Sequence, residues 1–261
     1  MKFWAITFNT FRETIRDRVL YNLLVFALLM IILSMALGML SFAEQERITI
    51  NIGLTTISLF GILMAVFLGI GLVSKEIERK TIHTLIAKPL PRWLFLLGRF
   101  SGLLLTIGVN ILIMTAAFGL ILVYLNYPER GLIWPLTWPI IQALILILAE
   151  LSIITAAAML FSTFSTPTLS AIFTLCFFVI GRFTAGIREL GEISPDPVFY
   201  WGAKILYYAV PNLRDYVPIE AALYGDGLSS LLFLTLLLKG ILTAAFFLVI
   251  AAGVFERRDF V

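Results

Sequence analysis

The sequence predicts an all-α integral membrane protein with six transmembrane helices in a single domain that covers residues 1–261. Hydrophobic residues make up 61% of the chain and charged residues 13%, whereas soluble domains have about 45–50% apolar and about 25% charged residues. Apolar runs of about 20 residues recur, which is the length that a helix needs to cross about 30 Å of hydrocarbon. Lipid, rather than a water-soluble core, therefore accounts for the apolar excess.

The N-terminal residues 1–18 are expected to form an interfacial helix that lies along the membrane surface. The charges of residues 16–18 would be costly inside lipid, so the aromatic side of this helix faces the membrane and its charged side faces water. The alternative is that these residues cap a longer first membrane helix. The stripe that faces the membrane, with spacings of four, three and four residues, consists of Trp4, Phe8, Phe11 and Ile15.

Six apolar runs are long enough to be membrane spans. A polar loop at 44–47 separates the first two spans, and Pro167 fits the first position of the fifth, where proline is favoured. Glycines of the third span are expected to be packing notches, because small residues let membrane helices approach closely. These glycines are Gly98, Gly102, Gly108 and Gly119. The approximate limits of the spans are residues 19–40, 52–73, 96–124, 140–161, 167–183 and 229–254.

The longest segment that does not span the membrane is residues 184–228, between the fifth and sixth spans. It is rich in proline, and its middle, from Phe199 to Tyr208, is rich in aromatic residues. Such a composition favours a helix that is partly embedded or re-entrant. We therefore expect a partly embedded outer segment rather than a soluble domain.

Lysine and arginine are distributed unevenly between the two sides that six spans define. Twelve of the 19 lie in the N-terminal segment, the 74–99 stretch and the C-terminal tail, whereas six lie on the other side. Because loops rich in these residues remain in the cytoplasm, both termini of this multi-pass protein of the cell membrane are expected to be cytoplasmic. The net charge of +3 fits contact with an anionic lipid bilayer and does not indicate nucleic-acid binding.

The sequence offers little for catalysis, and we predict no catalytic residue and no metal site. His83 is the only histidine and Cys176 the only cysteine, which excludes a zinc site built from several such ligands. His83 is expected to be an ordinary polar loop residue. The chain contains no Gly-x-x-x-x-Gly-Lys-Ser/Thr phosphate-binding motif. We therefore expect no cofactor in this chain and no ATP hydrolysis by that route.

Two charged residues, Glu150 and Lys239, lie deep inside the fourth and sixth spans. Each is about ten residues, or roughly 15 Å, from the outer end of its span. Charges at this depth are costly unless they are paired, so we expect Glu150 and Lys239 to form an ion pair, within one chain or across a dimer. The alternative is that one of them lines a substrate path. Arg182, near the predicted outer end of the fifth span, is expected to extend to the lipid headgroups.

Residues 74–95 form the predicted loop between the second and third spans. Within it, residues 81–87 are long enough for two helical turns. Pro89 and Pro91 would end such a helix, because each lacks an amide donor and restricts the residue before it. Arg92 then anchors the third span at the interface. The sequence therefore predicts a short, rigid helix, and the alternative is an ordinary basic cytoplasmic loop.

A spaced set of residues distinguishes this loop: Glu76, Thr81, Leu85, Pro89, Arg92 and Gly98. In this pattern the loop resembles the first cytoplasmic loop of ABC type-2 permeases, and more narrowly that of the permease of the nitrous-oxide-reductase maturation and multidrug-like export group. The chain departs from the group's pattern at Lys80, where glycine is usual, and at Arg99, where lysine is usual. The resemblance extends to the N-terminal helix, the six spans, the turn at 161–167 and the Val210–Leu213 element.

The resemblance implies a permease that pairs with a second copy or a homologue and binds two ABC ATPase subunits. ATP and Mg²⁺ would then bind to the partner ATPase and not to this chain. The short helix at 74–92 would be the coupling helix that docks on the ATPase, and the outer segment would gate the exit. The docking residues that the resemblance implies are Glu76, Glu78, Thr81, Leu85, Pro89 and Arg92.

The expected function is that of a transmembrane permease subunit of an ATP-driven ABC exporter. One alternative is a non-transporting assembly or sensor subunit that keeps the permease fold. A membrane-embedded enzyme is a further alternative, but it would need clustered His, Glu or Asp residues, and Glu150 is the only acidic residue deep within a predicted span.

Overall fold

The computed structural model describes residues 2–38, 45–78, 91–130, 136–193, 196–224 and 227–257, and the regular secondary structure of these residues is entirely helical. Six long helices are each apolar enough and long enough to cross a membrane, which confirms the predicted all-α membrane fold. These are α2 (Arg18–Gly38), α3 (Gln45–Glu78), α5 (Arg92–Arg130), α6 (Trp138–Phe164), α7 (Pro167–Ile193) and α10 (Ser230–Arg257). The shorter helices are α1 (Lys2–Thr14), α8 (Pro197–Ala209), the 3₁₀ helix η1 (Leu213–Tyr216) and α9 (Ile219–Tyr224).

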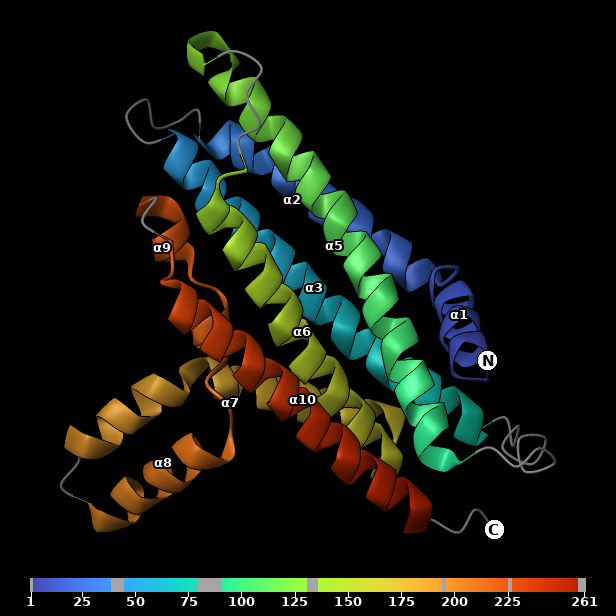
Figure 1. Ribbon diagram of the computed structural model, residues 1–261. Helices are drawn as coiled ribbons and strands as arrows, with labels where there is room; N and C mark the ends of the chain where they lie inside the picture. Colours follow the sequence, from blue (N-terminus) through green and yellow to red (C-terminus); the bar gives the residue numbers. More distant parts are fainter. Residues whose placement is uncertain are drawn as a thin grey trace.

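Helix α6 is the central element of the bundle. Of its apolar stretch 72% is buried, compared with 22% for α2 and for α10. It packs against α3 on one side and α10 on the other, and also contacts α7 (Figure 1). The outward faces of α2 and α10 are covered with exposed aliphatic and aromatic side chains, as expected where lipid is the solvent.

Glycines allow the long helices to approach each other closely. A Cβ on Gly61 would meet Leu151 of α6 at 2.6 Å, and one on Gly69 would meet Ala158 of the same helix at 2.7 Å. Real Cβ atoms are essentially never that close, so a larger residue at either position would push α3 away from α6.

Helix α1 is a separate helix that packs against the first half of α5. It ends at Thr14, and Asp17 begins α2 by accepting a hydrogen bond from the amide of Val19 at 3.0 Å. The alternative of a longer first membrane helix is therefore wrong. Of the predicted stripe, Trp4 and Phe8 are exposed, 63% and 52% respectively, whereas Phe11 and Ile15 are partly buried.

The contact between α1 and α5 is made through two of the predicted packing notches. A Cβ on Gly98 would meet Ile6 at 2.8 Å, and one on Gly102 would meet Thr10 at 2.6 Å. The interpretation of these glycines as notches is confirmed. A Cβ on Gly108 would have no atom of another element within 4 Å, so Gly108 is not a notch within the described chain.

Two helices extend into residues that the sequence suggested were loop or outer segment. Residues 45–47, expected in a polar loop, form the first turn of α3, where the acidic Glu46 is favoured by the positive end of the helix dipole. The fifth span was expected to end at 183, but α7 continues to Ile193. Its last turns are supported by an ion pair between Arg188 and Glu192 at 2.9 Å, four residues apart on the helix surface.

The outer segment forms a helical hairpin followed by short helices. Asp196 caps α8 by accepting a hydrogen bond from the amide of Val198, and α8 packs back on the end of α7, where Gly191 faces Ala203. Figure 1 shows this hairpin projecting to one side of the bundle. The chain then returns to the bundle through η1 and α9, which contact α6.

One end of the bundle gathers four elements from distant parts of the sequence. Helix α1, the last turns of α3, the first turn of α5 and the C-terminal end of α10 lie at this end in Figure 1. Helices α3 and α5 are also in contact with each other. The residues that connect them, 79–90, lie outside the described part of the chain.

Candidate functional site

The predicted docking residues fall mainly where the structure gives no description. Thr81, Leu85 and Pro89 lie outside the described residues. Glu76 and Glu78 belong to the last turns of α3, and Arg92 is the first residue of α5. The predicted coupling helix therefore stays a prediction, and the candidate site described below is in the interior of the bundle.

The centre of the site is a buried ion pair between α6 and α7. Glu150 of α6 is 0% exposed, and its Oε1 accepts a hydrogen bond from Nη1 of Arg182 at 3.0 Å. The hydroxyl of Ser58 on α3 donates to the other carboxylate oxygen at 3.3 Å. A single carboxylate thus joins three membrane helices.

This pairing differs from the two predictions made for these residues. Glu150 was expected to pair with Lys239, but within the chain its partner is Arg182. Arg182 was expected to extend to the headgroups from the end of its span, but α7 continues for eleven residues beyond it. The side chain can therefore turn inward, where Glu150 compensates its charge. An ion pair of Lys239 across a dimer stays a prediction.

Arg182 also joins the outer segment to the bundle. Its Nη1 lies 3.4 Å from the carbonyl oxygen of Leu213 in η1, and Leu213 fills the notch at Gly181 of α7. At the end of η1, Tyr216 packs against Gly240 of α10. A ring carbon of Tyr216 lies 3.2 Å from where a Cβ on Gly240 would be. Burial raises the pKa of the Tyr216 phenol to about 12, so this phenol is uncharged.

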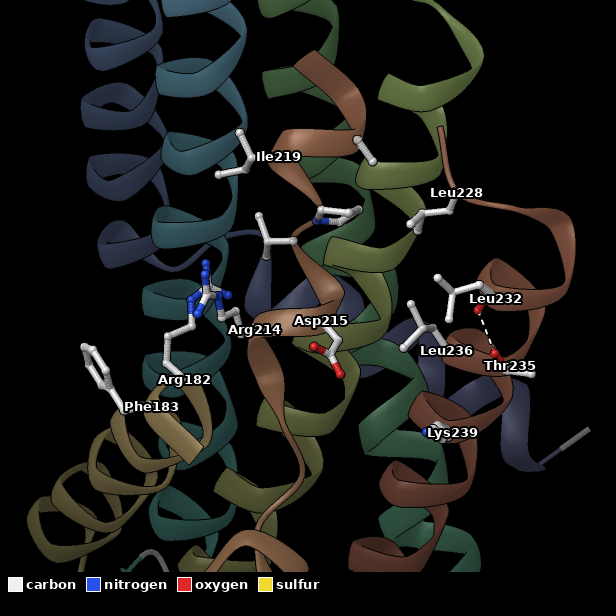
Figure 2. A pocket seen from close by; sticks show the side chains of 13 residues that line it. Arg182, Phe183, Arg214, Asp215, Ile219, Leu228, Leu232, Thr235, Leu236 and Lys239 are labelled. Carbon is white, nitrogen blue, oxygen red and sulfur yellow. Dashed lines mark hydrogen bonds between the residues drawn. The ribbon is translucent and has the colours of Figure 1, made fainter. Parts of the chain in front are cut away.

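A cavity of about 760 Å³ lies beside the ion pair, between α7, the η1–α9 segment and α10. Figure 2 shows Arg182 and Arg214 on one side of it, Asp215 near its centre and Lys239 on α10 at the other side. Burial raises the pKa of the Asp215 carboxyl, whereas the charges of Lys239 and Arg214 lower it. Among the described residues, the acidic neighbour of Lys239 is therefore Asp215 and not Glu150.

Next to the cavity, at Leu228, α6 contacts the turn before α10. The side-chain amide of Gln142 donates to the carbonyl of Leu228 at 3.1 Å and accepts from its amide at 3.0 Å. Gly227 precedes it with a φ of 63°, a left-handed conformation that glycine adopts without strain. Gln142 is 1% exposed, so both hydrogen bonds are shielded from water.

Several residues of this site were not predicted. Gln142 could have been found as a polar residue one turn into an apolar run, and Arg214 and Asp215 as charges beside a proline turn. Ser58 carries no signal, because serine is common in membrane helices. Among the described residues, no group of three or more His, Cys, Asp or Glu side chains lies close enough together to hold a metal ion.

Comparison with known proteins places the whole chain in one family. The model of the family described as ABC-2 family transporter protein matches residues 4–260. A comparison with curated proteins gives no match. Because the family match covers almost the entire sequence, including every helix of the site, the chain belongs to the ABC-2 family of transporter proteins and is a multi-pass membrane permease component of an ABC transporter.

Proposed function

We propose that this permease is the transmembrane subunit of an ATP-driven exporter and that a separate ATPase supplies the energy. The observation that carries the proposal is that α3 and α5 lead into and out of residues 79–90 at the end of the bundle that also holds α1 and the C-terminal end of α10 (Figure 1). The ATPase would dock here, on the cytoplasmic side. ATP and Mg²⁺ would bind to the ATPase, and this chain would have no enzyme activity of its own.

The continuity of α3 supports a mechanical route from this end to the candidate site. The helix runs without interruption from Gln45 to Glu78, and Ser58 on it hydrogen-bonds Glu150. A displacement of its cytoplasmic end would therefore act on the carboxylate that also holds Arg182. Through Arg182 it would reach η1 and the outer segment. ATP binding would favour one of two arrangements by its differential affinity for them.

Family membership implies ATPase partner subunits in general. We propose further that the complex contains two ATPase subunits and a second permease, either a copy of this chain or a homologue. The narrower likeness to the nitrous-oxide-reductase maturation permeases, which rests on the 76–98 pattern, is part of the same proposal. So are the cytoplasmic location of both termini and the outward direction of transport.

Affinity purification of the tagged protein from its native membrane tests the proposal. The soluble proteins that co-purify are identified by mass spectrometry, and an ABC ATPase is expected among them. The variants Thr81→Arg and Arg92→Glu should lose it, whereas His83→Ala, in the same loop, should retain it. Co-purification of no ATPase, or equal recovery with all three variants, would contradict docking at this loop.

Transport itself is tested with a mixture of candidate substrates. Inside-out vesicles from cells with and without the permease gene are incubated with a lipophilic extract of the same cells, with and without ATP. Mass spectrometry then identifies compounds that accumulate only with both ATP and permease, as an exporter requires. No such compound, despite a bound ATPase, would favour a non-transporting assembly or sensor subunit.

A further inference from the structure

The cavity beside Arg182 holds more positive than negative charge. Among the side chains that the structure describes, three cations line it, those of Arg182, Arg214 and Lys239, and one carboxylate, that of Asp215. Arg182 is compensated by Glu150, which is 3.0 Å away behind the cavity wall. Within this described lining, two cations thus share the carboxylate of Asp215, and one positive charge is left over.

The cation of Lys239 lies well inside the apolar length of α10, on a side chain that is exposed and not buried in protein. Lys239 is the tenth residue of α10, about 14 Å along the helix from its outer end. A lysine at this depth is costly unless an anion meets it. Among the residues that the structure describes, no carboxylate lies within ion-pair distance of Lys239. The cavity is therefore electrostatically prepared for an additional anion.

The rest of the cavity is apolar. On the α10 side its wall carries Leu228, from the turn before the helix, and Leu232 and Leu236 of α10, spaced four residues apart and followed by Lys239. The facing wall includes Val217 and Ile219. In Figure 2 Leu232, Leu236 and Lys239 follow one another along α10, and Leu228 lies on the chain that leads to it. The volume of about 760 Å³ lies within the range of roughly 300–1,000 Å³ in which small-molecule sites occur.

Lipid is one helix away from this apolar wall. The other face of α10 carries large exposed side chains, with Leu231, Leu234 and Leu238 exposed by 76%, 63% and 57%. A molecule with a hydrocarbon chain could thus enter the cavity from the bilayer past α10. A soluble polar anion would satisfy the charge but would leave the leucine wall without a partner.

We propose that this cavity binds an amphiphile with one anionic headgroup, held between Lys239 and Arg214, and with its hydrocarbon chain along the leucines of α10. Such a molecule comes either from the membrane, as an anionic lipid, or from solution, as a free fatty acid. The binding site goes beyond the proposed coupling to an ATPase and does not depend on it.

Photo-crosslinking of the full-length protein in phosphatidylcholine nanodiscs tests the proposal. Three diazirine-bearing probes are added separately: phosphatidylglycerol, palmitic acid and phosphatidylcholine. The labelled peptides are mapped by mass spectrometry. Labelling within residues 228–239 should be roughly tenfold higher with at least one anionic probe than with phosphatidylcholine, the change that one lost charge-assisted contact produces. Labelling by phosphatidylglycerol alone indicates a lipid, and labelling by palmitic acid alone indicates a soluble amphiphile.

Charge variants separate specific binding from general attraction to a basic protein. Lys239→Gln and the double variant Arg214→Gln/Lys239→Gln should reduce anionic labelling at 228–239 to the phosphatidylcholine level, and Lys239→Arg should retain it. The control Lys204→Gln removes a cation that lies over aromatic rings of α8 outside the cavity, and it should leave labelling unchanged.

Three results would overturn the proposal. They are equal labelling by all three probes, labelling that persists in Lys239→Gln, and an equal loss in the Lys204→Gln control. Because Lys239 is exposed and forms no ion pair with another described residue, Lys239→Gln is expected to fold, and its thermal unfolding midpoint is measured alongside. The assay contains no ATPase, so its outcome and that of the co-purification experiment are separate.

Discussion

The guanidinium of Arg182 and the carboxylate of Glu150 lie 3.0 Å apart and join α7 to α6 in the interior of the bundle. Glu150 is fully buried and Arg182 is 26% exposed. The same carboxylate accepts a hydrogen bond from Ser58, and the same guanidinium donates to the carbonyl of Leu213. The pair thus connects the core of the membrane domain with its outer segment.

Breaking this ion pair should destabilise the protein more than removing it. Glu150→Gln leaves the Arg182 charge without its partner, and removing one partner of a buried pair costs about 3–5 kcal/mol. Because Arg182 is partly exposed, we expect a value near the lower end. The double variant Glu150→Gln/Arg182→Gln should recover part of the loss. Thermal unfolding in detergent compares the stabilities of the unaltered protein, Glu150→Gln and the double variant.

The same measurement distinguishes Arg182 from Lys239 as the partner of Glu150. Lys239→Met is combined with Glu150→Gln, and the effects of the two substitutions should add, since no contact joins the two side chains within the chain. Additive effects for Glu150 and Arg182, together with coupling between Glu150 and Lys239, would contradict the pairing in the structure.

The turn at Gly227 should tolerate no other residue without a loss of stability. Its φ of 63° strains any residue with a Cβ, and that Cβ would lie 2.9 Å from Oε1 of Gln142. Gly227→Ala should therefore lower the free energy of unfolding by about 1–2 kcal/mol. Gly71→Ala is the control, because no atom of another element lies within 4 Å there. Equal midpoints for the two variants would refute this account of the turn.

Close packing of α1 on α5 predicts a difference between two glycines of the same helix. At Gly102 an added Cβ would meet Thr10 at 2.6 Å and the carbonyl of Thr7 at 2.7 Å, whereas Gly108 has open space. Gly102→Ala should lower the unfolding midpoint and expose α1 to protease, because overpacking typically costs about 1–3 kcal/mol. Gly108→Ala should be neutral or slightly stabilising, since alanine favours the helix. The reverse order would show that α1 does not pack here.

Most of the fold could be predicted because hydropathy alone identifies membrane helices. Pro167 at the start of α7 and the separate α1 followed directly from the sequence. The length of α7 did not, because the charges of Arg188 and Glu192 gave the appearance of a water-exposed segment. In the structure these residues pair with each other along the helix, and such a pair allows a helix to continue where its hydropathy falls.

The site was only partly predictable for the same reason. Sequence reasoning found Glu150 and Lys239, since charges inside apolar runs are conspicuous. It could not identify their neighbours, because these depend on which helix packs beside α6. A fifth span that ends at 183 placed Arg182 near the membrane surface and left Lys239 as the obvious partner. The roles of Asp215 and Gln142 required the path of the chain between α8 and α10.

The central claim, that energy enters through the 74–95 loop, is tested most directly by cysteine crosslinking. The chain has one cysteine, Cys176, so Cys176→Ser provides a cysteine-free background. Leu85→Cys is then introduced in the loop, and Leu231→Cys, at an exposed position in the first turn of α10, is the control. The cysteine is labelled in native membranes with a benzophenone maleimide, which on illumination inserts into C–H bonds of any protein next to it. Position 85 should then crosslink to an ABC ATPase and position 231 should not. An ATPase that co-purifies with the permease but crosslinks at neither position, or at 231 alone, would contradict the claim.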